Sequence, residues 1–196
     1  MPYQRFSTAS RTTPAMHQSI RIISGKHKGR KIRGPKNLPV RPTTDFAKEG
    51  LFNILHHGGG LVGAKVLDLF SGTGNIAYEF GSRGANHIDC VDQHRGCIKF
   101  IEETTLTLDL PIRCFQGSVL KFLEHHQGHY DFIFADPPYE LEQSILLELI
   151  ALIFERNLIA EHGLFILEHE KERDFSSHEY WVNSRKFGGS VFSFFE

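Results

Sequence analysis

The chain is constrained most by a regular alternation of short apolar runs with amphipathic stretches, which begins at residue 65. The apolar runs predict strands over residues 65–70, 87–92, 112–116, 131–135 and 163–168. The stretches between them predict helices near residues 74–83, 94–108, 118–125 and 140–155. Strands and helices that alternate in this way form a parallel sheet covered on both faces, so we expect an α/β, Rossmann-like domain over residues 60–196.

The C-terminal end of the chain departs from this alternation. Two strand-like runs, 180–186 and 190–195, are joined through Gly188-Gly189 with no helix between them. Such a pair forms an antiparallel hairpin. We therefore expect a seven-stranded, mostly parallel sheet with an antiparallel last strand.

An N-terminal extension over residues 20–59 precedes this domain. Its runs 21–25 and 29–33 predict a β-hairpin, and the prolines of residues 34–42 keep that segment extended. A helix should follow from Thr43-Thr44, whose hydroxyls can cap its first N–H groups. Before the extension, residues 1–19 lack acids and are rich in Ser and Thr, which is typical of a disordered tail.

The composition is that of a globular protein, with 40% hydrophobic and 23% charged residues. No apolar run reaches the roughly 18 residues of a membrane span, so we expect no membrane partner. Three cysteines without a C-x-x-C pair argue against a disulfide framework or zinc site and favour a reducing, cytoplasmic location. His125, His126 and His129 lack the zincin spacing, so we expect solvated histidines at a helix end and no metal site.

The net charge of −1 conceals a strong asymmetry. Residues 1–50 carry eleven Lys/Arg and two acids, whereas residues 51–196 carry the other eleven Lys/Arg and 21 of the 23 acids. A basic arm on an acidic body is typical of polyanion binding, although a lysine-rich edge that prevents aggregation explains the composition equally well. The candidate nucleic-acid contacts are Arg21, Lys26, Lys28, Arg30, Lys31 and Arg33.

The segment 68–74 (DLFSGTG) closes the first predicted strand of the main domain and opens a helix. Gly72 and Gly74 let the backbone turn tightly and approach a ligand, because neither has a Cβ. They also begin a match to the G-x-G-x-x-G/A fingerprint, so the glycines alone do not separate NAD from S-adenosylmethionine (SAM). Asp68 favours SAM, since a carboxylate there would repel a pyrophosphate and attract the ammonium of a methionine moiety.

Further candidate cofactor residues follow the neighbouring strands. Asp92 ends the second predicted strand, where a carboxylate can accept hydrogen bonds from a ribose diol or cap the next helix. Ser118 and Val119 follow the third strand and could meet an adenine ring or simply begin a helix. Phe70 lies within the glycine loop itself and belongs to the same predicted site.

The most specific signal is Asp136-Pro137-Pro138-Tyr139, directly after the apolar run 131–135. The lone pair of a nucleobase amino group is delocalised into the ring, so the amine is a poor nucleophile. A carboxylate oxygen of Asp136 and a carbonyl of the proline-stiffened turn can accept both amino hydrogens and return electron density to nitrogen. Tyr139 offers an aromatic face on which an extruded base can stack.

Several further motifs occur with this tetrapeptide: R-I-I-x-G at 21–25, G-R-K-I at 29–32, R-P-T-T-D at 41–45, K-E-x-L-F-N at 48–53, D-L-F-S-G-T-G at 68–74 and S-R-G-A at 82–85. Together they resemble the RsmD family of bacterial 16S rRNA guanine-N2 methyltransferases, which are class I SAM-dependent enzymes. The resemblance runs from about residue 21 to residue 196.

The resemblance implies methyl transfer from SAM to the N2 amino group of one guanine in 16S rRNA, in the cytoplasm. It also implies that the substrate is a partly assembled small subunit, and that the hairpin and the segment with Arg41 and Thr43 hold RNA or shape the cofactor pocket. Asp136, Pro137 and Tyr139 would be the catalytic residues. We expect a monomer.

Other functions remain open from the residues themselves. The Asp136 turn suits several planar amino groups, so an adenine-N6 or glutamine-directed methyltransferase is an alternative. A non-catalytic RNA-binding assembly factor that retains the fold is another. A dehydrogenase is the weakest alternative, because Asp68 precedes the glycines.

Overall fold

The computed structural model describes residues 19–35, 43–57 and 60–196. Most of the predicted tail (residues 1–18) and the candidate contact Arg41 lie outside these ranges. The described strands are β1 Ser19–Arg21, β2 Lys31–Arg33, β3 Lys65–Leu69, β4 His87–Asp92, β5 Ile112–Gln116, β6 Tyr130–Ala135, β7 Ile159–Glu170, β8 Trp181–Phe187 and β9 Ser190–Phe195. The described helices are α1 Asp45–His57, α2 Asn75–Ser82, α3 Arg95–Leu108, α4 Val119–His125 and α5 Gln143–Glu155.

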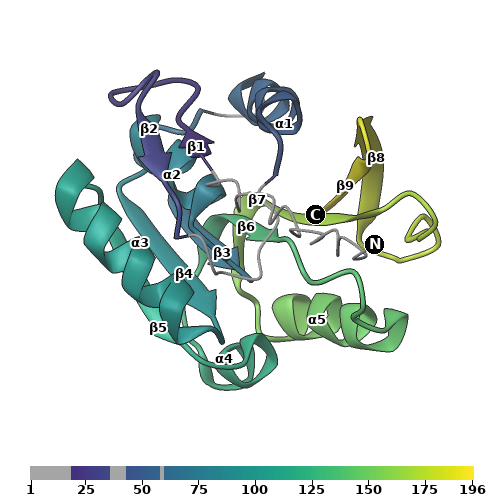
Figure 1. Cartoon of the computed structure of the whole chain (residues 1–196). Helices are drawn as coiled ribbons and strands as arrows, with labels where there is room; N and C mark the ends of the chain where they lie inside the picture. Colours follow the sequence, from purple (N-terminus) through teal and green to yellow (C-terminus); the bar gives the residue numbers. More distant parts are fainter. Residues whose placement is uncertain (1–18, 36–42, 58–59) are drawn as a thin grey trace, which may run out of the picture.

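Seven strands form one sheet in the order β5-β4-β3-β6-β7-β9-β8, while β1 and β2 form a separate antiparallel pair (Figure 1). The pairs among β3 to β7 are parallel. The last strand, β9, is antiparallel to both β7 and β8 and lies between them. This confirms the predicted seven-stranded, mostly parallel sheet with an antiparallel last strand.

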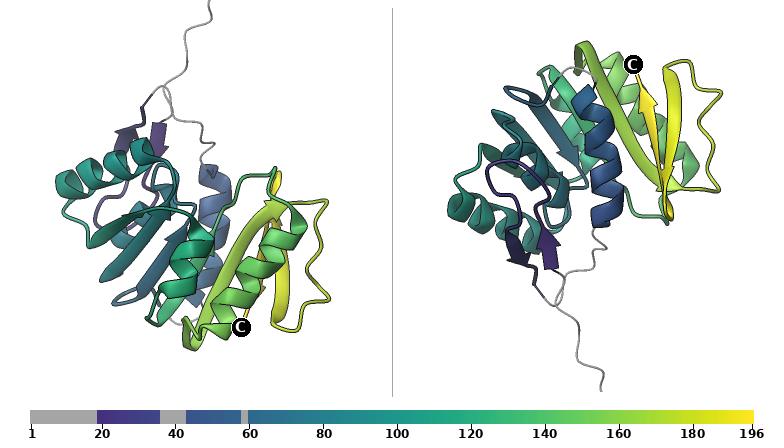
Figure 2. Two further views of the ribbon diagram at one scale, coloured as in Figure 1. Left: turned by 90° about the horizontal axis from the view of Figure 1, so that it is seen from below. Right: turned by 90° about the horizontal axis from the view of Figure 1, so that it is seen from above.

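Helices cover both faces of the sheet. Side chains of α1, α2 and α3 pack with one face in a core that includes Val66, Phe134 and Phe194. Side chains of α4 and α5 pack on the other face with Leu67 and Phe165. Figure 2 shows the hairpin and α1 on one side of the sheet and α4 and α5 on the other. None of the helices in the described ranges is long and apolar enough to cross a membrane.

Helix α1 begins directly after Thr43 and Thr44, as their capping hydroxyls led us to expect. Thr44 Oγ1 accepts a hydrogen bond from the Ala47 N–H at 3.2 Å. The interior of this helix contains Gly50, and a Cβ there would lie 2.1 Å from the Phe187 ring of β8. Glycine is therefore what allows α1 to pack closely on the C-terminal hairpin.

The N-terminal hairpin is shorter than predicted. We expected strands over 21–25 and 29–33, but the N–H groups of Ile23 and Ser24 instead donate to the buried carboxylate of Glu79 on α2, at 2.8 and 3.0 Å. Those backbone groups are therefore not available to extend a strand ladder. Gly25 has a φ of +82° and lies so close to α2 that a Cβ would overlap the Ser82 carbonyl oxygen. The loop is thus fixed on the C-terminal end of α2.

Candidate active site

A cavity of about 1150 Å³ opens at the carboxyl ends of β3, β4, β6 and β7. Its walls include the loops that follow these strands, the start of α1 and the turn between β8 and β9. The chain crosses from β3 to β4 on one side and later to β6 on the other side of β3, and ligands bind at such a switch point in open α/β sheets. The cavity is large enough for a cofactor together with a second planar molecule.

The glycine loop connects β3 to α2 at the floor of this cavity. Phe70, Gly72 and Gly74 all have positive φ angles, of 57°, 51° and 77°. A positive φ is uncommon for a bulky residue such as Phe70. Backbone strain of this kind is found mainly at functional sites, where the surrounding structure holds it in place. Here the Ser71 hydroxyl donates to the Asp68 carbonyl at 2.6 Å and holds the loop from within.

Asp68 is almost completely buried, with 2% of its surface exposed, yet it lines the cavity. Its Oδ2 atom has no hydrogen-bond partner among the described residues. Burial raises the pKa of this carboxyl from 3.8 to about 8; a backbone hydrogen bond from Ala77 opposes the shift and repulsion by Asp92 adds to it. A cationic amino group placed against Oδ2 would remove the cost of ionising it. The residues present therefore fit the ammonium end of a SAM molecule.

Asp92 lies at the end of β4 with 9% of its surface exposed. Its Oδ2 accepts the Gly72 N–H at 2.9 Å, and its Oδ1 accepts the His94 N–H at 2.7 Å. The cap of α3 is His94, whose Nδ1 faces the Cys97 N–H at 3.3 Å, so the interpretation of Asp92 as that cap is wrong. Each carboxylate oxygen keeps a further lone pair that can accept a ribose hydroxyl.

Ser118 and Val119 lie on the same side of the cavity as Asp92. Ser118 is the exposed N-cap residue of α4 but makes no side-chain cap bond, and Val119 is buried. The Gly117 N–H bonds the Asp92 carbonyl at 3.0 Å, which ties this edge to the end of β4. The apolar Val119 and the unused Ser118 hydroxyl fit the edge of an adenine ring.

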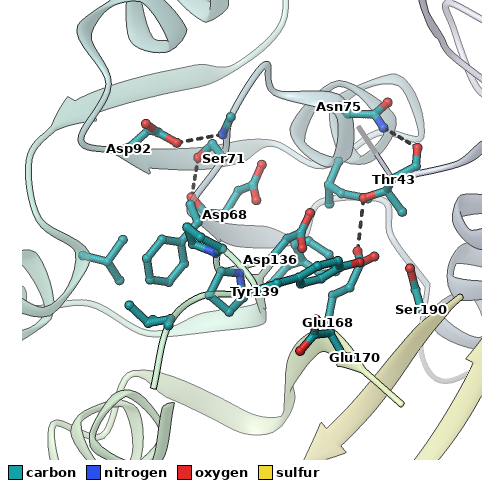
Figure 3. A pocket seen from close by; sticks show the side chains of 18 of the residues that line it. Thr43, Asp68, Ser71, Asn75, Asp92, Asp136, Tyr139, Glu168, Glu170 and Ser190 are labelled. Carbon is teal, nitrogen blue, oxygen red and sulfur yellow. Dashed lines mark hydrogen bonds between the residues drawn. The ribbon is translucent and has the colours of Figure 1, made fainter. Parts of the chain in front are cut away.

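The Asp136 turn lies across the cavity from the start of α4. Asp136 is half-buried, Pro137 is buried and Tyr139 is 37% exposed. The Asp136 N–H bonds the Leu69 carbonyl at 3.4 Å, so the turn begins beside the start of the glycine loop. Figure 3 shows Asp136 and Tyr139 beside Asp68, around one cavity. The acidic turn and the glycine loop are therefore close enough to share a pair of ligands.

Three groups that support the site were missed by sequence reasoning. Arg173, on the loop after β7, donates to the carbonyls of Tyr139 and Leu141, both at 2.7 Å, and so fixes the segment that follows the prolines. Glu168 on β7 is 3% exposed and lines the cavity. Asn75 donates to the Thr43 carbonyl at 2.9 Å and joins the start of α1 to α2. No local motif marks these residues, because their partners lie far away in the sequence.

Thr43 was a candidate RNA contact, but the structure places it in the cavity wall, 9% exposed. Its hydroxyl donates to Glu168 Oε2 at 3.1 Å. Behind it, the buried Lys48 ammonium donates to Asn75 Oδ1 at 2.8 Å and to the Arg21 carbonyl at 2.6 Å. Burial lowers the pKa of Lys48, and Glu79 and Asp45 oppose that shift. This segment therefore shapes the cavity.

The other candidate contacts lie on the hairpin, outside the cavity wall. Arg21 pairs with Asp45 at 2.8 Å, beside the start of α1. Lys26 donates its N–H to the Ser82 carbonyl at 2.7 Å, at the end of α2 opposite to the cavity. The remaining candidates are exposed residues of the same hairpin, namely Lys28, Arg30, Lys31 and Arg33.

Sequence analysis predicted that the histidines at positions 125, 126 and 129 are solvated, and this prediction is only partly correct. His125 has an 85% exposed side chain, but His126 stacks on Phe122 and lies 2.6 Å from the Tyr130 hydroxyl. The expectation of a solvated side chain is therefore wrong for His126, and burial lowers its pKa. Within the described ranges, no group of three or more His, Cys, Asp or Glu is arranged to hold a metal ion.

Comparison with known proteins agrees with this geometry. The family model described as "Conserved hypothetical protein 95" matches residues 20–196. The chain belongs to this family. Ribosomal RNA small subunit methyltransferase D of Escherichia coli is 32% identical over 154 residues, which cover 78% of this chain and 76% of the relative. The protein of the same name from Haemophilus influenzae is 29% identical over 87% of this chain and 89% of its own length. The resemblance to the RsmD family is thereby confirmed.

Solved structures share the fold. The yhhF protein of Escherichia coli superposes with a TM-score of 0.80 at 28% identity, over 91% of this chain and 97% of that chain. A Thermus thermophilus 16S rRNA N2 methyltransferase (RsmC), solved with AdoMet and guanosine, superposes with a TM-score of 0.72 at 16% identity, over 92% of this chain and 50% of that chain. The predicted Rossmann-like class I methyltransferase fold is confirmed.

Proposed function

We propose that this protein transfers a methyl group from SAM to the N2 amino group of a guanine in small-subunit rRNA. The observation that carries the proposal is the arrangement of two acidic groups around one cavity. Asp68 fits a cationic amino group, and Asp136 in its proline turn fits a planar amine. The names of the relatives, which are rRNA small subunit methyltransferases, support the substrate class.

On this proposal the cofactor lies along the glycine loop. Asp68 holds the methionine ammonium, the Asp92 carboxylate accepts the ribose hydroxyls, and Ser118 and Val119 meet the adenine ring. SAM supplies an electrophilic methyl group on a sulfonium, whose C–S bond breaks as the N–C bond forms and leaves its electron pair on sulfur. Phe70, held at a positive φ within this loop, helps to close the cavity wall.

The Asp136 turn prepares the nucleophile. The Asp136 carboxylate and the Pro137 carbonyl each accept one hydrogen of the guanine amino group, which moves electron density toward N2. Tyr139 stacks on the base that has been turned out of the RNA. Arg173 keeps the turn in place through the carbonyls of Tyr139 and Leu141, and the proton lost from N2 passes to water beside Asp136.

The RNA is held outside the cavity by the basic hairpin. Lys28, Arg30, Lys31 and Arg33 are exposed and contact phosphates without reading sequence. The chain acts as a monomer in the cytoplasm, on a partly assembled small subunit. The division at residue 60 between an RNA-binding extension and a methyltransferase domain belongs to the same proposal, although Ile20 and Leu51 share a core with the sheet.

Mass spectrometry tests the target atom. Small-subunit rRNA and partly assembled subunits from cells lacking this gene are incubated with the protein and isotopically labelled SAM, then digested to nucleosides and peptides. We expect label in N2-methylguanosine. Label in N6-methyladenosine or methylglutamine would support the alternative methyltransferases, and a protein that binds RNA without binding SAM would be an assembly factor.

A further inference from the structure

A second carboxylate lies beside the Asp136 turn. Ala135 and Leu167 are paired in the parallel register of β6 and β7, so Asp136, the first residue after β6, and Glu168, within β7, are the next residues along two adjacent strands. Adjacent strands are about 4.8 Å apart. Both side chains line the cavity, and Figure 3 shows both of them near Tyr139.

Glu168 is held in a fixed position. It is 3% exposed and lies in the part of β7 that pairs with β9, where its partner is Phe192. Thr43 donates its hydroxyl to Glu168 Oε2 at 3.1 Å, and Asn75 in turn holds the Thr43 carbonyl. A carboxylate fixed in this way presents acceptor atoms to the cavity and no donors.

The chemistry of the two purines differs at the atom beside the amine. In guanine the N1 atom next to the C2 amino group carries a hydrogen, whereas in adenine the N1 atom next to the C6 amino group carries a lone pair. We propose that Glu168 accepts the N1–H of the guanine whose N2 amine is bound by Asp136, and so determines that guanine is the substrate. This inference rests on the proposed function.

Adenine presented to the same turn would place its N1 lone pair against the Glu168 carboxylate. Two acceptors would then lie face to face in the cavity, and neither would be satisfied. Sites that bind a substrate N–H or O–H in this way reject analogues that lack the hydrogen by about 10⁴-fold or more. The Asp136 turn alone has no such selectivity, because both bases offer it an NH₂ group.

The test uses 2-aminopurine, which keeps the C2 amine of guanine but has an unprotonated N1. Once the methylated position has been mapped, small-subunit rRNA is prepared by ligation with either guanine or 2-aminopurine there. We expect wild-type kcat/KM to be at least about 100-fold lower on the 2-aminopurine RNA. The Glu168→Gln variant has a carboxamide N–H that can donate to N1. In this variant the kcat/KM values on the guanine RNA and the 2-aminopurine RNA should differ by no more than about tenfold, and the SAM affinity should be unchanged.

Glu172→Gln is the matched control, because it makes the same chemical change on a 66% exposed side chain at the cavity mouth. It should keep the wild-type ratio. If Glu168→Gln is inactive on both RNAs, the kcat/KM of Glu168→Ala is measured on the same two RNAs. The ratio of the two values should again be smaller than in the wild type, because the repelling carboxylate is gone. A wild-type protein that methylates both RNAs equally, or Glu168 variants that keep the full ratio, would overturn the inference. A wild-type protein that methylates neither RNA would instead overturn the proposed function.

Discussion

Replacing Asp68 with Asn should stabilise the protein while weakening its binding of SAM. The carboxyl group is buried with Oδ2 unpartnered, and its pKa is raised from 3.8 to about 8. At pH 7 the unfolded chain has already lost this proton, whereas the folded chain keeps it. Each pH unit above the unfolded pKa lowers the free energy of unfolding by about 1.4 kcal/mol until the folded pKa is reached, and pH 7 is about three units above 3.8. The neutral amide avoids this loss, so it should raise the free energy of unfolding by up to about 4 kcal/mol.

The sign of the pH dependence follows from the same shift. Between pH 4 and pH 8 the folded state binds more protons at Asp68 than the unfolded state does, so this carboxyl makes the free energy of unfolding fall as the pH rises through that window. Urea unfolding of both proteins at pH 5, 6, 7 and 8 measures the difference, which should grow with pH. Calorimetry at pH 7 should show that wild-type SAM binding releases a proton and that Asp68→Asn binds SAM weakly. An Asp68→Asn protein no more stable than wild type at pH 8 would refute the reasoning.

Three other variants test the cofactor site, the turn and the RNA surface separately. Asp92→Ala should weaken SAM binding by about 10- to 100-fold through loss of charge-assisted hydrogen bonds, and an unchanged calorimetric Kd would reject its ribose role. Arg173→Ala frees two carbonyls of the Tyr139 segment and should lower kcat about tenfold with the SAM Kd unchanged; wild-type kcat would show that this arginine does not position the turn. Replacing Lys28, Arg30 and Lys31 with Glu should raise the KM for RNA and weaken the dependence of KM on salt concentration. An unaltered salt dependence would show that the hairpin is a solvated edge and does not bind RNA.

The sheet and most of its elements could be predicted because they depend on local pattern. The runs 87–92, 112–116 and 190–195 match β4, β5 and β9 residue for residue. The glycine loop and the Asp136 turn were also correctly placed at the ends of strands, since each motif consists of contiguous residues; only the structure shows that these strands, β3 and β6, are neighbours. Their meeting in one cavity follows from the carboxyl-end rule for parallel sheets.

Contacts between distant parts of the chain could not be predicted. Thr43 and Glu168 are 125 residues apart, and only the packing of α1 against the sheet brings the hydroxyl to the carboxylate. The hairpin ended early because Glu79, on a helix more than 50 residues away, bonds its backbone. Arg173 looks like an ordinary surface charge in the sequence, and its two bonds to carbonyls exist only in the folded loop.

The central proposition is that the Asp136 turn activates an amine rather than holding the cofactor. Single-turnover methylation of small-subunit rRNA by wild type and Asp136→Ala, with the SAM Kd of each measured by calorimetry, tests it most directly. The account predicts a rate lower by about 10²- to 10³-fold or more in the variant, with nearly the same Kd. Methylation at the wild-type rate, or a loss of SAM binding in proportion to the loss of rate, would contradict it.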